Sequence, residues 1–332
     1  MSDRWTADAL LELARAYQPA SILLAAAELD LFGALEKAPL DAAGLAAELG
    51  ADPRATRILA DALTALGLLD KSDTLYSPAS GVAETLTADG SKSVLPMLWH
   101  QANCMRSWVQ LAATAKTGRP AGDHESIRGA EADRAAFIEA MEVASRHAAE
   151  DLIAALAPLS FRHLLDVGGG PATWTRAFLR VVPEARATLY DLPEVIPLSR
   201  AHIAAAGFGD RVDFVAGDFY NDAALPAGAD LVWISAIVHQ NSREQNRSLF
   251  GKVHAALVPG GELMIRDMVM NDLHTSPRAG ALFAVNMLAR TESGGTYSFA
   301  ELREDLEIGG FGEPTLVHGA RDMDCVVRAR RL

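Results

Sequence analysis

The sequence predicts an α/β protein whose carboxy-terminal half forms a doubly wound parallel sheet ending in an antiparallel hairpin. Three observations predict this fold class. From residue 163 onward, short apolar runs alternate with stretches typical of helices. A glycine-rich turn at residues 168–170 joins the first apolar run to a helix that begins near Thr173. The chain then closes with two apolar runs joined by a short polar turn, which are expected to pair in antiparallel orientation.

The predicted strands are short and are separated by segments long enough to hold a crossover helix. The parallel strands are expected at residues 163–167, 187–191, 212–215, 230–235 and 262–267, and the hairpin strands at 314–318 and 324–327.

The amino-terminal region is predicted to be mainly helical. Residues 6–36 are expected to form two helices broken at Pro19, because proline lacks the N–H that a helix interior needs. The order helix, helix, hairpin that follows is typical of a winged helix. Its elements are residues 42–49 behind the N-cap Asp41, a helix from Asp52-Pro53 through Leu66, and a hairpin at 68–76.

Residues 94–157 are expected to be mostly helical, with a loop at residues 117–123 where glycine, proline and polar residues gather. The predicted domains are therefore an amino-terminal domain (1–95), a helical linker (96–158) and the α/β domain (159–332).

Composition excludes several classes of partner. The 332 residues include 30 Lys and Arg against 43 Asp and Glu, a formal net charge of −13 that disfavours nucleic acid and anionic membrane surfaces. The two cysteines, Cys104 and Cys325, lack the spacing of a zinc site and fit a reducing compartment. Without a basic, apolar leader or a run long enough to span a bilayer, the chain is expected to be cytoplasmic.

Acidic residues follow the predicted strands at regular intervals. Asp166 precedes the glycine turn, and Asp191 lies 25 positions further on, where a carboxylate can accept hydrogen bonds from ribose hydroxyls. Asp218 and Phe219 close the third strand another 27 positions on. There the acid can meet an adenine amino group while the aromatic ring lies against the base. Together these three strand ends predict a site for an adenine nucleoside.

Four motifs stand at the predicted strand ends: Asp166-Val167-Gly168-Gly169-Gly170, Asp191-Leu192-Pro193, Gly217-Asp218-Phe219 and Ile237-Val238-His239. They resemble those of a known family, the small-molecule O-methyltransferases of the caffeate and hydroxyneurosporene type, which depend on S-adenosylmethionine (SAM). The resemblance extends from about Leu10 to Val327. It implies a seven-stranded Rossmann-like methyltransferase sheet behind a winged-helix-like dimerisation domain, and hence a homodimer.

The resemblance also implies two groups of binding residues. The predicted SAM-binding residues are Asp166, Gly168, Gly170, Asp191, Leu192, Asp218, Phe219 and Ser235. The predicted acceptor-binding residues are Trp99, Phe137, Met141, Asn286 and Met287, which could instead be ordinary core or helix-face residues.

His239 is the predicted general base. It follows the fourth parallel strand, and an imidazole that is neutral near pH 7 can take the proton of a phenol that attacks a methyl sulfonium. Asp267 closes the neighbouring fifth strand and matches a family glutamate that orients the base. The chain departs from the family pattern at three other positions: Ala172 replaces a glycine of the turn, and Gln240 and Tyr297 replace acids.

These features predict a SAM-dependent O-methyltransferase that acts on a hydroxyl of an aromatic or polycyclic small molecule. Three alternatives stay open: a SAM-binding relative that performs hydroxylation, decarboxylation or ring formation; a C- or N-methyltransferase; and a ligand-sensing winged-helix regulator.

Overall fold

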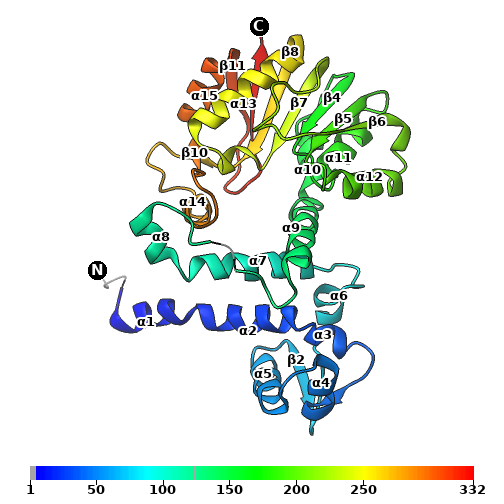
Figure 1. Cartoon of the computed structure of the whole chain (residues 1–332), viewed down its shortest axis with the longest axis vertical. Coiled ribbons are helices and arrows are strands. Elements are labelled where there is room, and N and C mark those ends of the chain that lie inside the picture. Colours follow the sequence, from blue (N-terminus) through cyan, green and yellow to red (C-terminus); the bar gives the residue numbers. More distant parts are fainter. Residues whose placement is uncertain (1–4, 123) are drawn as a thin grey trace. The chain divides into compact units, whose positions relative to one another are not determined.

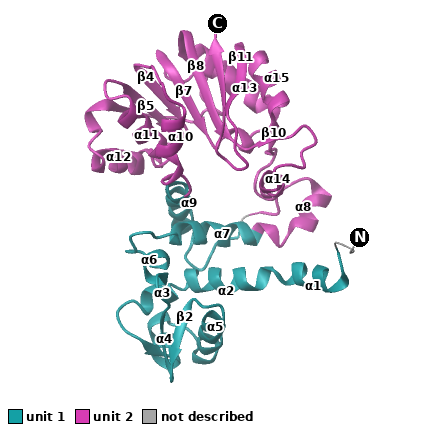
Figure 2. Cartoon of the chain, turned by 180° about the vertical axis from the view of Figure 1, so that it is seen from behind, with its two compact units in different colours: residues 1–106, 124–143 teal, residues 107–123, 144–332 magenta. Residues whose placement is uncertain are grey.

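The computed structural model describes residues 5–122 and 124–332. The chain divides into two compact units, which Figure 2 shows in different colours. Unit 1 comprises residues 1–106 and 124–143, and unit 2 comprises residues 107–123 and 144–332. The predicted separate linker domain at 96–158 stays a prediction.

Unit 1 contains the predicted helices and hairpin, together with one short additional strand that pairs with the hairpin. Its helices enclose a small core that includes Phe32, Leu45, Leu63 and Tyr76, each 1% exposed or less. Its elements are α1 (Ala7–Arg15), α2 (Tyr17–Glu28), α3 (Leu31–Ala34), β1 (Leu40–Asp41), α4 (Ala42–Leu49), α5 (Pro53–Ala65), β2 (Leu69–Ser72), β3 (Leu75–Pro78), α6 (Val82–Leu86) and most of α7 (Leu95–Trp108) and α9 (Ala130–Ser145).

The helix boundaries near the start of the chain differ from the prediction. The predicted break at Pro19 is wrong, because Pro19 lies in the first turn of α2, where the backbone N–H groups have no partner within the helix. The second helix also ends earlier than expected, since Asp30 takes a left-handed conformation (φ 55°) before α3. The N-caps Asp41 and Asp52 are confirmed; each accepts a 2.8 Å hydrogen bond from a first-turn N–H.

Unit 2 is built around a seven-stranded sheet in the order β11-β12-β8-β7-β4-β5-β6. The prediction of five parallel strands and a terminal antiparallel hairpin is confirmed: β12 runs antiparallel to both of its neighbours, β8 and β11. The strands are β4 (His163–Val167), β5 (Arg186–Asp191), β6 (Val212–Ala216), β7 (Ala229–Ser235), β8 (Leu257–Asp267), β11 (Phe311–His318) and β12 (Cys325–Arg331).

Helices cover both faces of this sheet (Figure 1). Helices α10, α11 and α12 pack on one face, and α13 and α15 pack on the other. The helical elements of unit 2 are α8 (Leu111–Thr117), α10 (Ala148–Ala155), α11 (Thr173–Val181), α12 (Ile196–Ala205), η1 (Gly209–Arg211), η2 (Val238–Gln240), α13 (Arg243–Ala256), α14 (Arg278–Arg290) and α15 (Phe299–Ile308), and a small parallel pair joins β9 (Val269–Met270) to β10 (Tyr297–Ser298).

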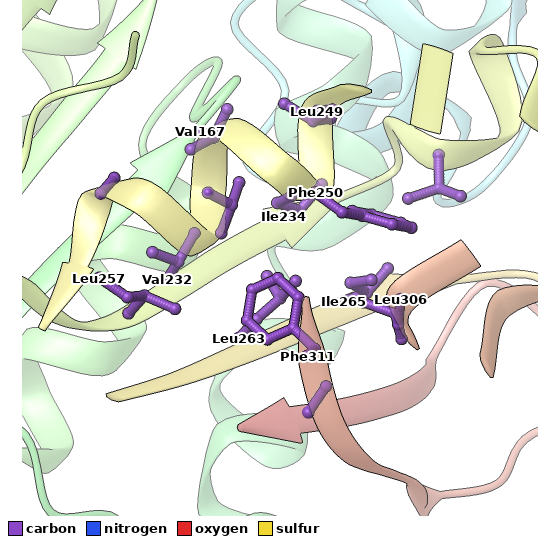
Figure 3. Close-up of a cluster of buried hydrophobic side chains, with 14 of the residues drawn as sticks. Val167, Val232, Ile234, Leu249, Phe250, Leu257, Leu263, Ile265, Leu306 and Phe311 are labelled. Carbon is purple, nitrogen blue, oxygen red and sulfur yellow. The ribbon is translucent and has the colours of Figure 1, made fainter. Parts of the chain in front are cut away.

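Alternate residues of β7 divide between the two cores because successive side chains of a strand point to opposite faces. Val232 and Ile234 pack with Phe250 of α13 in the cluster of Figure 3. Trp233 lies on the other face, where its ring contacts those of Trp174 and Phe178. The sheet is thus buried on both sides, which leaves its carboxyl edge as the place where a ligand can reach it.

No helix in the described part of the chain has the length and apolar character needed to cross a membrane.

Candidate active site

The strand register brings four predicted site residues to one edge of the sheet. Val167 pairs with both Tyr190 and Ile234, so the next residues, Gly168, Asp191 and Ser235, lie side by side. Asp191 pairs in turn with Ala216 of β6, two residues before Asp218. The polar ends of β4, β5, β6 and β7 therefore form one continuous row.

The glycine turn after β4 has backbone geometry that side chains would disturb. Gly168 has a φ of 70°, and a Cβ there would lie 2.7 Å from Cδ1 of Ile237. Gly170 has a φ of 52°, and a Cβ there would meet no protein atom within 4 Å. Gly170 therefore borders open space, which leaves room for a ligand against the backbone. Ala172, where the family has glycine, keeps the left-handed conformation with a φ of 62°.

Asp191 and Leu192 lie beside this turn at the end of β5. The two Asp191 oxygens accept 2.7 Å hydrogen bonds from the N–H groups of Gly170 and Leu192. Burial raises the pKa of this carboxyl, while the two N–H groups oppose that effect. The Leu192 side chain is 39% exposed. An anchored acid beside an open apolar surface suits a ribose diol and the edge of a base.

Asp218 and Phe219 occupy the turn after β6. The Asp218 carboxylate accepts hydrogen bonds from the Tyr220 N–H (2.9 Å) and the Asn221 side-chain amide (2.7 Å). Phe219 is half-buried against the core, and its ring centroid lies 4.4 Å from that of Tyr220. These contacts fix an acid and an aromatic ring next to each other at the sheet edge.

Asp166 differs from the other predicted cofactor residues because it is only 1% exposed. Its carboxylate accepts a 2.5 Å hydrogen bond from the Thr175 hydroxyl in α11. Burial, reinforced by the charge of Asp191, raises the pKa of Asp166 to about 7. Asp166 thus connects the end of β4, just before the glycine turn, to α11, the helix that follows the turn.

Ser235 is also engaged within the protein, since its hydroxyl accepts a 3.1 Å hydrogen bond from Arg266 of β8. Arg266 is 5% exposed and forms an ion pair with Asp324.

His239 and Asp267 form a buried pair at the same edge. Nδ1 of His239 lies 2.8 Å from one Asp267 oxygen, and the other Asp267 oxygen accepts from the His239 backbone N–H at 3.2 Å. The two residues are 6% and 3% exposed. An ionised carboxylate only accepts hydrogen bonds, so Nδ1 carries the proton and Nε2 is the basic nitrogen.

Phe283 contacts the other side of the pair, and the sequence prediction missed it. Its ring stands edge-on to the imidazole, with centroids 4.7 Å apart and planes at 83°. Phe283 lies on α14, one turn before the predicted acceptor residues Asn286 and Met287. That helical spacing is the signal that could have identified it.

A buried hydrogen-bond network holds the segment that carries His239. The Asn246 side-chain amide donates to the Val238 carbonyl (3.1 Å), and that of Asn241 donates to Asn246 (2.9 Å). Tyr297, which stands in place of a family acid, donates its hydroxyl to the Asn241 carbonyl. The Gly295 N–H donates to the carbonyl of His239 itself (2.9 Å). The network fixes the backbone on which the imidazole is mounted.

The predicted acceptor residues fall in different units. Trp99, Phe137 and Met141 belong to unit 1, whereas Asn286 and Met287 belong to unit 2 with His239. Trp99 donates a 2.9 Å hydrogen bond to the Ala27 carbonyl, and the Arg128 guanidinium lies 3.5 Å from its ring centroid. Phe137 is 43% exposed and packs its ring against His100.

On α14, the Asn286 side-chain oxygen accepts a 2.8 Å hydrogen bond from the indole N–H of Trp108, and Met287 is 6% exposed. Within unit 2, α14 thus places Phe283 against the His239 ring and holds the Trp108 ring beside Asn286.

Comparisons with known proteins identify the family of the chain. The O-methyltransferase domain family matches residues 108–312, and the O-methyltransferase dimerisation domain matches residues 11–89. The chain belongs to the SAM-dependent O-methyltransferase family.

Particular relatives cover nearly the whole chain. It is 31% identical over 316 residues to the tetracenomycin polyketide synthesis 8-O-methyl transferase of Streptomyces glaucescens, which covers 91% of this chain and 90% of that protein. It is 32% identical over 317 residues to the 3-hydroxy-5-methyl-1-naphthoate 3-O-methyltransferase of Streptomyces sahachiroi, with 94% and 91% covered. The human N-acetylserotonin methyltransferase structure in complex with SAM superposes with a TM-score of 0.83 at 24% identity, covering 100% and 99% of the two chains. This last likeness is one of fold.

Proposed function

We propose that the enzyme transfers a methyl group to a hydroxyl of an aromatic or polycyclic small molecule, with His239 as the general base. The buried His239–Asp267 pair carries this proposal. A protonated Nδ1 held at 2.8 Å by a carboxylate leaves Nε2 as the one ring nitrogen that can accept the proton of a phenol.

The proposed SAM site is the row of strand ends. Gly168 and Gly170 provide the backbone turn, Asp191 the ribose contact, and Leu192 with Phe219 the apolar surfaces for adenine. The open space beside Gly170 and the anchored Asp191 carboxylate fit such a ligand. Asp166, Asp218 and Ser235 complete the set, and the Thr175 contact assigns Asp166 the task of holding the turn.

When bound, SAM supplies an electrophilic methyl group attached to a sulfonium. The protein's residues prepare the attacking oxygen. His239 takes the hydroxyl proton onto Nε2, and the Asp267 carboxylate stabilises the imidazolium that results. A base of this kind contributes roughly 10²–10⁴-fold to the rate, and holding the reactants in line contributes the remainder.

The acceptor class is supported by the activities of two relatives, a polyketide 8-O-methyl transferase and a naphthoate 3-O-methyltransferase. We propose that Asn286 and Met287 line the acceptor pocket, and that Phe283 joins them because its ring contacts that of His239. Trp99, Phe137 and Met141 belong to unit 1, and their contact with the acceptor stays a prediction.

We also propose a cytoplasmic homodimer. The match to the dimerisation domain family supports the dimer. The two buried free cysteines fit a reducing compartment.

The test is a panel of phenols and naphthols incubated with SAM, with S-adenosylhomocysteine and the methylated product measured together. We expect His239→Ala to lower turnover at least about a hundredfold while the SAM dissociation constant, measured by calorimetry, stays near wild type. His254→Ala is the matched control, because His254 lies in the last turn of α13 and packs on Phe311 at the opposite edge of the sheet.

If no hydroxyl compound yields S-adenosylhomocysteine, the proposal fails in favour of another chemistry on the same fold. If the methyl group is found on carbon or nitrogen by NMR, the acceptor atom is wrong although the donor site stands. Loss of SAM binding in His239→Ala would show that the residue is misplaced.

A further inference from the structure

A cavity of about 650 Å³ lies in unit 2 at the carboxyl end of α14. One wall is the loop after α8, which contributes Arg119. The other wall is the end of α14 and the residues that follow it, which contribute Arg290, Glu292 and Ser293. Helices α8 and α14 pack against each other, so the two walls belong to one body.

The two arginines of this cavity have unused guanidinium groups. Neither side chain makes a hydrogen bond or an ion pair within the described residues, and Glu292 forms an ion pair with neither. By contrast, Arg243 and Arg266 of the same unit are bound to carboxylates at 2.9 Å or less.

Each arginine lies near the carboxyl end of a helix, where the helix dipole favours a cation. That effect explains a positive charge at each position. It does not require both residues to line the same cavity, where Arg290 is half-buried and Arg119 is exposed. Two guanidinium groups in a concave surface are well suited to bind a carboxylate through paired N–H donors.

Helix α14 connects this cavity to the proposed base. Phe283, which contacts the His239 ring, and Arg290 are seven residues apart, so they lie on the same face of the helix two turns from each other. At 1.5 Å per residue, the separation along the helix axis is about 10 Å. Asn286 lies between them on that face and holds the indole of Trp108.

The chain then returns from the cavity to the base over residues 291–295. Ser293 donates a 2.9 Å hydrogen bond to Gln245, and the Gly295 N–H donates to the carbonyl of His239. The cavity wall and the base segment are thus joined by a short, hydrogen-bonded loop.

We infer that Arg119 and Arg290 form a subsite for an anionic group at the far end of the acceptor, and that the acceptor is an elongated aromatic carboxylic acid. The acceptor's hydroxyl lies at His239 and its carboxylate lies about 10 Å away. This length matches the distance along α14 from Phe283 to Arg290. The inference rests on the proposed function, because it places the reacting hydroxyl at His239.

The first experiment measures binding without turnover. 2-Naphthoate has no hydroxyl to methylate, so calorimetry of the intact enzyme reports binding alone. The uncharged 2-naphthamide serves as its counterpart, and the difference between the two affinities reports the subsite. We expect 2-naphthoate to bind at least about tenfold more tightly than 2-naphthamide, and Arg290→Gln or Arg119→Gln to remove that difference. Arg278→Gln, the same charge change at the exposed first turn of α14, should leave the difference in place.

The second experiment measures the ratio of kcat/KM for pairs of acceptors. We expect 6-hydroxy-2-naphthoate, with its hydroxyl and carboxylate at opposite ends, to be preferred over both 2-naphthol and 1-hydroxy-2-naphthoate. Arg290→Gln should lower the 6-hydroxy-2-naphthoate to 2-naphthol ratio by about tenfold.

The possible outcomes distinguish a wrong anion subsite from a wrong proposed function. If 2-naphthol is methylated but 2-naphthoate binding ignores both arginine variants, the subsite is wrong and the proposed function stands. If inorganic phosphate binds as tightly as 2-naphthoate, the cavity holds a free anion and the assignment to the acceptor is wrong. If 2-naphthoate binding depends on both arginines while no naphthol is methylated, the anion subsite stands and the proposed function fails.

Discussion

At the scale of single residues, Asp267 sets which nitrogen of His239 is basic. A carboxylate accepts the Nδ1 proton, whereas an asparagine presents either an acceptor or a donor and therefore permits the opposite tautomer. We expect Asp267→Asn to lower kcat by about 10²-fold or more while SAM affinity stays within about threefold. The difference in kcat between wild type and Asp267→Asn should narrow as pH rises toward about 10, where a phenol ionises without a general base.

The pH profile is the decisive measurement for that variant. A purely structural role for Asp267 would lower activity by the same factor at every pH and would weaken SAM binding as well. Either result would contradict the positioning role.

The buried carboxyl of Asp166 is expected to make the free energy of unfolding depend on pH. Burial raises the pKa of its carboxyl in the folded chain to about 7, whereas the unfolded carboxyl has an ordinary pKa near 3.8. The folded state therefore retains a proton that the unfolded state releases between these values. The stabilising contribution of this group is complete below about pH 4 and is lost as pH rises through about 7, with a limiting slope of roughly 1.4 kcal/mol per pH unit.

We expect Asp166→Asn to remove this component. Without bound SAM, the urea midpoint of the variant should rise relative to wild type as pH increases from 5 to 8. Asp272→Asn, a change at an exposed position, is the control. A difference between Asp166→Asn and wild type that does not change with pH would refute the assigned protonation.

At the scale of elements, the short helix η2 depends on polar contacts from distant segments. Tyr297 belongs to β10, yet its hydroxyl donates to the Asn241 carbonyl just after η2. Burial raises the pKa of Tyr297 to about 12, so the hydroxyl is a neutral donor throughout the physiological range. The tyrosine therefore fixes the base segment through a hydrogen bond, where the family pattern has an acid.

Tyr297→Phe is expected to leave a buried carbonyl short of a donor and to lower the free energy of unfolding by about 1–3 kcal/mol. Turnover should fall with little change in SAM affinity, because the segment that carries His239 becomes less well fixed. Tyr220→Phe is the comparison, because the Tyr220 hydroxyl also donates to Asn241 but Tyr220 is 48% exposed. This variant should lower the free energy of unfolding by less. Equal losses in stability for the two variants would show that burial is not the deciding factor.

At the scale of the whole molecule, α1 has no buried residue within its own unit, although it carries several large apolar side chains. Leu10 and Leu13 of α1 lie three residues apart on one helix face, and they are 52% and 56% exposed. Tyr17, the first residue of α2, is 60% exposed. Such a surface indicates that another chain covers it. The match to the dimerisation domain family is consistent with a second copy.

We expect the double variant Leu10→Glu, Leu13→Glu to sediment as a monomer in analytical ultracentrifugation, while wild type sediments as a dimer. Ile58→Glu changes an exposed apolar residue on α5 and should keep the dimer. A dimer that persists in the α1 variant would place the interface elsewhere in unit 1.

Several site residues could be found from the sequence because strand order and turn chemistry are local. Asp191 and His239 each follow an apolar run, and the carboxyl ends of parallel strands meet at one edge of a sheet. Phe283 and Arg290 could not be found in this way. Helical spacing could place Phe283 on the same face as Asn286, but where α14 packs after the fifth strand decides what Phe283 and Arg290 contact.

The sequence by itself determined the order of strands and helices, the glycine turn and the acids at the strand ends, because backbone propensity and hydrophobic period act over a few residues. Only the tertiary structure decided that Asp166 turns inward to Thr175, that Tyr297 supports η2 and that two arginines share a cavity. Those contacts join segments far apart in the chain, and burial and hydrogen bonding are set by which segments meet.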